Sequence, residues 1–107
     1  MEYNADTYTI LCGRSAKGND QLLDECAPHD IWFHVDGQSS AHVILVNEKK
    51  EKMNKIPKKV IKRCACICKA STKQTGKCVI IYTLRQDVTK TDVLGRVIPV
   101  NIKSITL

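Results

Sequence analysis

The amino-acid sequence predicts an α+β fold, with one mixed and mainly antiparallel sheet against which a main helix and a shorter helix pack. The stretch DIWFHVDGQSSAHVILV, residues 30–46, alternates apolar and polar side chains and then turns back, which is typical of a hairpin. CVIIYT at residues 78–83 is a nearly continuous apolar run, and PKKVIKRCACICKAS at residues 57–71 repeats apolar residues at helical spacing. Because 107 residues suffice for one modest core and not for two, we expect residues 1–107 to form a single domain.

The first half of the chain is expected to contribute a strand, a short helix and the hairpin, in that order. YTILCG, residues 8–13, indicates a strand closed by Gly13. GNDQLLDEC, residues 18–26, indicates a helix with Asn19 or Asp20 as its N-cap. The first strand of the hairpin separates two sets of side chains: Ile31, Phe33 and Val35 on the face that the main helix should cover, and Trp32, His34 and Asp36 on the other, before a short connection with Gly37 and Gln38.

The second half is expected to contribute a loop, the main helix and three strands. Residues 47–54 have almost no apolar side chain to bury, so they should form a loop before a helix that starts near Pro57. The apolar run at residues 78–83 should lie inside the sheet. RVIPV at residues 96–100 and IKSITL at residues 102–107 supply two further strands. The helical spacing predicts these buried residues: Val60, Ile61, Cys64, Ile67 and Cys68.

Positive charge is concentrated in the middle of the chain. The net charge is +6, but residues 1–46 carry −5 and residues 47–107 carry +11. Residues 47–77 alone hold eleven basic and two acidic residues, and such a field favours a polyanionic partner. The alternative is an ordinary solvated set of lysines. On the main helix, spacings of three, four or their sums place four of the lysines in one stripe: Lys58, Lys62, Lys69 and Lys73.

Several classes of protein are not expected from this sequence. Its apolar runs are far shorter than the roughly 20 residues of a membrane helix, and its N-terminus is acidic where a secretory signal is basic. We therefore expect an intracellular protein, cytoplasmic or nuclear, without membrane contact. The six cysteines are expected to be reduced thiols, because Cys64, Cys66 and Cys68 are spaced around a helix and not paired for zinc. No metal and no cofactor is predicted.

The hairpin also contains the residue types of a catalytic site. Ser39 or Ser40 with a histidine and Asp36 could form a nucleophile triad, but they lie close together in one hairpin, and local proximity does not make a triad. The sequence has no G-x-S-x-G element and no Gly-rich phosphate loop. His34 and Asp36 could begin a metal site, yet no third ligand has convincing spacing. We therefore predict that the protein is not an enzyme.

The hairpin and its flanking segments together resemble the NFACT-R domain family. The resemblance rests on D-I-W-F-H and S-S-A-H-V in the hairpin, on GRSAKGNDQLL before it, and on IPKKVIKRCACICKAS and CVIIYT after it. It runs from about residue 8 to residue 107. It implies an α+β domain proposed to bind RNA, which also occurs within larger ribosome-associated quality-control proteins. The matched positions are Gly13, Arg14, Asn19, Asp30, Trp32, His34, Ser39, Ser40 and His42, none of which the resemblance implies to be catalytic.

Stand-alone members of this family continue into a charged helical tail, whereas the sequence ends at Leu107 after its last predicted strand. A function that resides in such a tail is therefore not expected of these 107 residues.

The sequence thus predicts a non-enzymatic nucleic-acid-binding module, with RNA as its ligand. The alternative is a protein-interaction module that docks on a ribosome-associated partner. For Trp32 and His34, a binding role and a structural role both stay open. The predicted contacts to nucleic acid are Arg14, Lys17, Ser39, Ser40, His42, Lys49, Lys50, Lys58, Lys62, Lys69 and Lys73.

Overall fold

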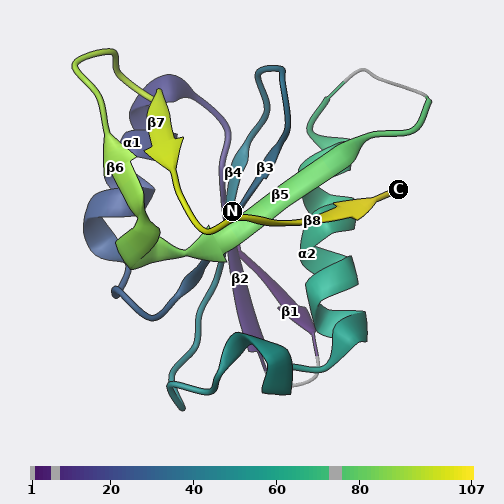
Figure 1. The fold of residues 1–107 in the computed structure, drawn as a ribbon. Coiled ribbons are helices and arrows are strands. Elements are labelled where there is room, and N and C mark those ends of the chain that lie inside the picture. Colours follow the sequence, from purple (N-terminus) through teal and green to yellow (C-terminus); the bar gives the residue numbers. More distant parts are fainter. Residues whose placement is uncertain (1, 6–7, 73–75) are drawn as a thin grey trace.

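A six-stranded sheet with one helix on each face makes up most of the computed structural model, which describes residues 2–5, 8–72 and 76–107 (Figure 1). Every described strand pair is antiparallel, so the predicted α+β class with a mainly antiparallel sheet is confirmed. The predicted apolar strand lies inside the sheet. In spatial order the strands are β1 (Glu2–Ala5), β2 (Tyr8–Gly13), β4 (His42–Leu45), β3 (Ile31–Val35), β5 (Val79–Leu84) and β8 (Lys103–Thr106).

A second, two-stranded sheet lies beside α1 (Ala16–Glu25) and consists of β6 (Val88–Lys90) and β7 (Val97–Pro99) (Figure 1). The strand that the sequence predicts at residues 96–100 therefore pairs locally with β6 and does not join the main sheet. A short 3-10 helix, η2 (Arg85–Asp87), turns the chain from β5 into β6. The ammonium group of Lys90 lies 3.0 Å from a carboxylate oxygen of Asp20 and also pairs with Asp24, which ties the small sheet to α1.

Helix α1 begins earlier than the sequence predicted. Its N-cap is Ser15, whose hydroxyl accepts a hydrogen bond from the Gly18 amide at 2.9 Å, so the prediction of Asn19 or Asp20 as the cap is wrong. Asn19 lies one turn inside the helix and is buried. The side chain that could have capped the helix instead reaches strand β4, as described below.

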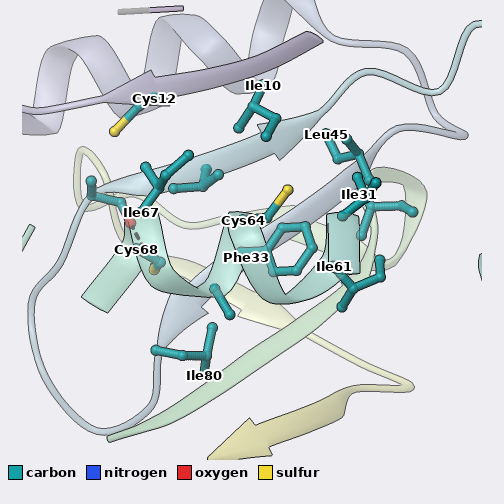
Figure 2. Packing of buried hydrophobic residues seen from close by; sticks show 14 of the residues in the cluster. Ile10, Cys12, Ile31, Phe33, Leu45, Ile61, Cys64, Ile67, Cys68 and Ile80 are labelled. Carbon is teal, nitrogen blue, oxygen red and sulfur yellow. Dashed lines mark hydrogen bonds between the residues drawn. The ribbon is translucent and has the colours of Figure 1, made fainter. Parts of the chain in front are cut away.

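Helix α2 (Lys58–Ala70) follows a short 3-10 helix, η1 (Met53–Lys55), and covers one face of the sheet. Figure 2 shows its apolar side packed on side chains of β2, β3, β4 and β5. All five helix residues predicted to be buried are buried, and Ala65 joins them. Burial raises the pKa of the Cys64 and Cys68 thiols to about 12, and the six cysteines, all of them among the described residues, form no disulfide bond.

The opposite face of the sheet carries a smaller core under α1 and the small sheet. Trp32 and Phe33 are both buried, at 1% and 0% exposure, but they belong to different cores because neighbouring residues of a strand point to opposite faces. The predicted division of the β3 side chains between the two faces is therefore confirmed. Within the described residues, no helix combines the length and the apolar character that crossing a membrane requires. The buried side chains of the smaller core are Leu23, Trp32, Ile44, Ile81 and Val88.

Candidate nucleic-acid interface

A hollow of about 1360 Å³ surrounds the connection of the β3–β4 hairpin, residues 36–41. It is called the hairpin hollow below. Its lining comes from the end of β2, the first turn of α1, the hairpin, one side of α2 and the loop between β6 and β7. In Figure 1 the hairpin connection is the blue loop at the top, between the ends of α1 and α2. The hollow therefore lies where segments from both faces of the sheet meet.

Three aromatic rings are packed together at the base of the hollow. The rings of Trp32 and His34 are nearly parallel, with centroids 5.7 Å apart and planes at 4°. His42 stands edge-on to both rings, 5.6 Å from Trp32 and 5.0 Å from His34. Trp32 and His42 are each only 1% exposed, whereas His34 is half-buried. His34 is therefore the ring of this cluster that a ligand in the hollow can reach.

Hydrogen bonds fix the tautomer of His42. The indole Nε1–H of Trp32 donates to Nδ1 of His42 at 3.2 Å, so Nδ1 carries no proton and the proton of the neutral ring is on Nε2. That nitrogen is left to bond the backbone of Gly95. Burial, with a smaller effect of His34, lowers the pKa of His42 to about 4, and burial also lowers the pKa of His34. Both imidazoles are therefore neutral at pH 7.

Asn19 connects helix α1 to this cluster. Its side-chain Oδ1 accepts a hydrogen bond from the backbone N–H of His42 at 3.1 Å. The contact requires a close approach of α1 to β2, because a Cβ on Gly13 would lie 2.5 Å from the same Oδ1 atom. Gly13 is also the residue opposite His42 in the β2–β4 register. The segment from Gly13 to Asn19 thus positions His42 from the side.

The serines of the hairpin differ in their surroundings. The hydroxyl of Ser40 accepts a hydrogen bond from the Val35 amide at 3.1 Å and lies 3.0 Å from the Ala41 carbonyl, to which it donates. Ser39 is exposed and lines the hollow. Within the described residues, neither serine has a hydrogen bond to a histidine. The nucleophile triad that the residue types alone would allow is therefore not assembled here.

Three arginines line the hairpin hollow from three different elements. Arg14 follows β2, Arg63 lies on α2, and Arg96 lies in the loop before β7. All three are exposed. Asp36 is the single carboxylate-bearing residue among the described residues of the lining, so positive charge predominates. Within the described part of the chain, the side chains of Arg63 and Arg96 have no ion-pair or hydrogen-bond partner.

The structure brings six of the sequence-predicted residues to the hollow, and the predicted lysines that it describes lie outside the lining. The six are Arg14, Trp32, His34, Ser39, Ser40 and His42. Lys17 is exposed in the first turn of α1. Lys49 and Lys50 are exposed in the loop after β4, at the far end of that strand (Figure 1). On α2, Lys58 and Lys62 are exposed and the ammonium group of Lys69 donates to the Leu107 carbonyl at 3.1 Å, whereas Lys73 lies outside the described residues.

Sequence reasoning missed Arg63 and Arg96. At 100° per residue, Arg63 lies about 100° around α2 from Lys62, on the side that faces the hairpin. The sequence placed the lysine stripe on the exposed surface but carried no signal for which exposed side borders the hairpin. Arg96 reaches the hollow because β7 belongs to the small sheet, which the sequence did not predict.

A family model described as the NFACT protein RNA binding domain matches residues 2–101. The chain belongs to the NFACT-R family. This confirms the resemblance carried by the hairpin and its flanks, and it makes the chain an RNA-binding-type module by family. Among relatives, coiled-coil domain-containing protein 25 of Mus musculus is 43% identical over 91 residues, which are 82% of this chain and 44% of the mouse protein.

A further relative comes from yeast, and a solved bacterial structure has a similar fold. Protein JLP2 of Saccharomyces cerevisiae is 35% identical over 82 residues, covering 71% of this chain and 39% of that protein. The chain therefore spans less than half of the length of these curated relatives. The C-terminal part of the fibronectin/fibrinogen-binding protein of Streptococcus suis superimposes with a TM-score of 0.85 over 99% of this chain and 43% of that one. At 18% sequence identity, that likeness shows a shared fold and nothing further.

Proposed function

We propose that this NFACT-R domain, residues 1–107, binds RNA without catalysing a reaction, and that the hairpin hollow is its main contact. One observation carries the proposal: Arg14, Arg63 and Arg96 line one hollow with a single carboxylate among its described residues. Guanidinium groups bind phosphate with two parallel hydrogen bonds, which suits a nucleic-acid backbone. The family description supports RNA as the polyanion.

The lysines outside the hollow have a different part in this proposal. Residues 47–77 hold eleven basic and two acidic residues, so their field attracts a polyanion from a distance. Lys17 and Lys62 are exposed on the two helices that flank the hollow and can add phosphate contacts at its margin, whereas exposed Lys58 lies at the start of α2, before the residues of that helix that line the hollow. Lys49 and Lys50 are exposed in the loop after β4, at the opposite end of that strand from the hairpin connection, so they are not part of the hollow.

The experiment is a titration of a short labelled single-stranded RNA at several salt concentrations. Each phosphate contact lowers the log–log salt slope by about 0.7 on a single strand. The double variant Arg63→Gln with Arg96→Gln should therefore bind RNA at least about tenfold more weakly at low salt. The magnitude of its log–log salt slope should be smaller by about 1.4 than that of the wild type. Both residues are exposed, so the melting temperature should stay the same.

A matched control removes the same charge elsewhere. Lys49→Gln with Lys50→Gln also takes two positive charges from exposed side chains, but at the far end of β4. Its effect on RNA affinity should be clearly smaller than that of the arginine pair. If the lysine pair weakens binding as much or more, the hollow is not the main contact; if the wild type does not bind RNA at low salt, the proposed function is wrong.

A second candidate function is docking on a ribosome-associated protein, in translation or ribosome quality control within the cytoplasm or nucleus. The observation in its favour is a group of exposed apolar side chains in and beside β7, among which Ile98 is 58% and Val100 51% exposed. Exposed apolar groups of this size mark protein contacts when they are contiguous. A pull-down with and without nuclease separates the two functions. A ribosomal protein that remains bound after nuclease, and is lost in Ile98→Ser with Val100→Ser, favours docking.

A further inference from the structure

The hairpin hollow has an uncharged part as well as an arginine-bearing one. Val93 and Leu94, in the loop between β6 and β7, are 51% and 55% exposed, and Ile102, before β8, is 48% exposed. All three line the hollow. Exposed aliphatic side chains beside arginines are not needed for a phosphate contact. Their presence indicates a ligand that has an apolar surface next to its charge.

The half-buried ring of His34 gives this uncharged part a flat, fixed surface. Trp32 packs parallel to His34 with planes at 4°, and His42 packs edge-on at 5.0 Å. Trp32 and His42 are in turn joined by their hydrogen bond. Because its neighbours hold the ring in place, His34 would lose little conformational freedom when a second flat group stacks on it.

The protonation of the histidines fits the same division of the hollow. Burial lowers the pKa of His34, and that of His42 to about 4, so neither ring adds positive charge at pH 7. The charged groups that line the hollow are the arginines and Asp36. Phosphates are thus attracted to the arginines and not to the imidazoles, whereas a neutral aromatic ring suits the face of a base.

We propose that the hairpin hollow accepts an unpaired nucleobase of the RNA strand, stacked on His34 and in contact with Val93 and Leu94. This rests on the proposed function, and it specifies single-stranded or unpaired RNA as the ligand. In a duplex, the faces of each base are covered by its stacked neighbours, so only a base that has left the stack can meet a protein ring. The arginines then hold the phosphates on either side of that base.

The test compares three labelled RNA ligands of equal length at the same salt concentration: a single strand, the same strand with abasic sites at its central positions, and the duplex. The abasic strand keeps every phosphate, so the difference in affinity between the intact and the abasic strand measures the contribution of the bases alone. Base stacking on a protein aromatic group predicts that the intact strand binds about 5- to 150-fold tighter than the abasic strand. The intact strand should also bind tighter than the duplex.

Two pairs of substitutions assign the difference to the hollow. Val93→Ser with Leu94→Ser should weaken binding of the intact strand and leave the abasic strand unchanged. Ile98→Ser with Val100→Ser removes apolar side chains that are equally exposed but do not line the hollow, and it should change neither. Since all four residues are about half exposed, the variants should remain folded, which the melting temperature checks.

The possible failures are distinguishable. If the intact and abasic strands bind equally and both depend on Arg63 and Arg96, the base contact is wrong and the RNA-binding function stands. The base contact is also overturned if the duplex binds as tightly as the single strand, or if the two serine pairs act alike. If no RNA binds, the proposed function and this inference fall together.

Discussion

The indole nitrogen of Trp32 donates a hydrogen bond of 3.2 Å to Nδ1 of His42, between two side chains that are each 1% exposed. Because a buried donor cannot find water when its acceptor is removed, this bond makes His42 part of the fold. His42→Ala should therefore lower the free energy of unfolding by about 1–3 kcal/mol. Chemical denaturation, followed by the fluorescence of Trp32, measures it.

His29→Ala is the matched control, because His29 lies outside this ring cluster, before β3. It should change stability by less than about 0.5 kcal/mol. A His42 variant that is as stable as the control and binds RNA poorly would instead assign His42 a direct binding role.

The lowered pKa of His42 predicts how stability depends on pH. A histidine titrates near 6.5 in the unfolded chain and, at this position, near 4 in the folded protein. Between these values the unfolded state binds more protons, so this ring makes the free energy of unfolding rise with pH. Its contribution to stability is lost as pH falls from about 6.5 to about 4. A difference of about 2.5 pH units corresponds to about 3 kcal/mol at most. Urea denaturation at several pH values measures this slope.

His42→Gln isolates the contribution of this one ring. The glutamine amide keeps an oxygen that can accept from Trp32, but it does not titrate. The variant should show a flatter dependence between pH 4 and 6.5 than the wild type. The same slope in both proteins would mean that carboxylates, or His34, account for the acid sensitivity.

The fold was predictable where a single segment carries its own pattern. The β3 alternation assigned Trp32 and Phe33 to opposite faces, and the helical spacing predicted that Cys64 and Cys68 are buried. Both signals depend only on residues near in sequence. The start of α1 was not predictable in this way, because Asn19 has the side chain of a cap but bonds to His42, a residue 23 positions away.

The candidate site was predictable only in part, for the same reason. Ser39, Ser40 and the histidines of the hairpin could be predicted as site residues, because several hydrogen-bonding side chains lie close together in that one segment. Arg63 and Arg96 come from α2 and from the loop of the small sheet, and their approach to the hairpin depends on tertiary packing. The sequence predicted His42 as a contact to nucleic acid, whereas the structure buries its ring in the fold; for His34 the sequence left both roles open, and the structure leaves its ring half-buried.

The close approach of α1 to β2 predicts a steric effect at Gly13. An added Cβ would lie 2.5 Å from Asn19 Oδ1 and 3.0 Å from its backbone N and Cα atoms. Since the backbone of α1 would have to shift, Gly13→Ala should destabilise the protein by about 1–3 kcal/mol. Thermal or urea unfolding measures the loss.

Gly76→Ala is the control for Gly13→Ala, because an added Cβ there meets no atom within 4 Å. It should be neutral or stabilise by up to about 1 kcal/mol, through the lower entropy of the unfolded chain. Equal effects of the two substitutions would show that crowding against Asn19 is unimportant.

Cys66 provides a native reporter for the hairpin hollow. It is the exposed member of the six cysteines and lines the hollow on the same side of α2 as Arg63. Cys64 and Cys68 are buried and have pKa values raised to about 12, so they stay protonated and unreactive. Cys12 and Cys78 are also buried, and burial raises the pKa of half-buried Cys26. Fast alkylation by iodoacetamide is therefore expected at Cys66 alone in the folded protein, and saturating RNA should slow it. Mass spectrometry of the labelled peptides follows the rate.

Two controls test whether the slower alkylation comes from RNA bound at the hairpin hollow. Cys66→Ser should abolish the fast alkylation, and high salt, which releases the RNA, should restore the unprotected rate in the wild type. RNA bound only at Lys49 and Lys50 would leave the rate unchanged, because that loop lies at the far end of β4 from the hollow. Unchanged alkylation at an RNA concentration that saturates binding would therefore exclude the α2 side of the hollow from the interface.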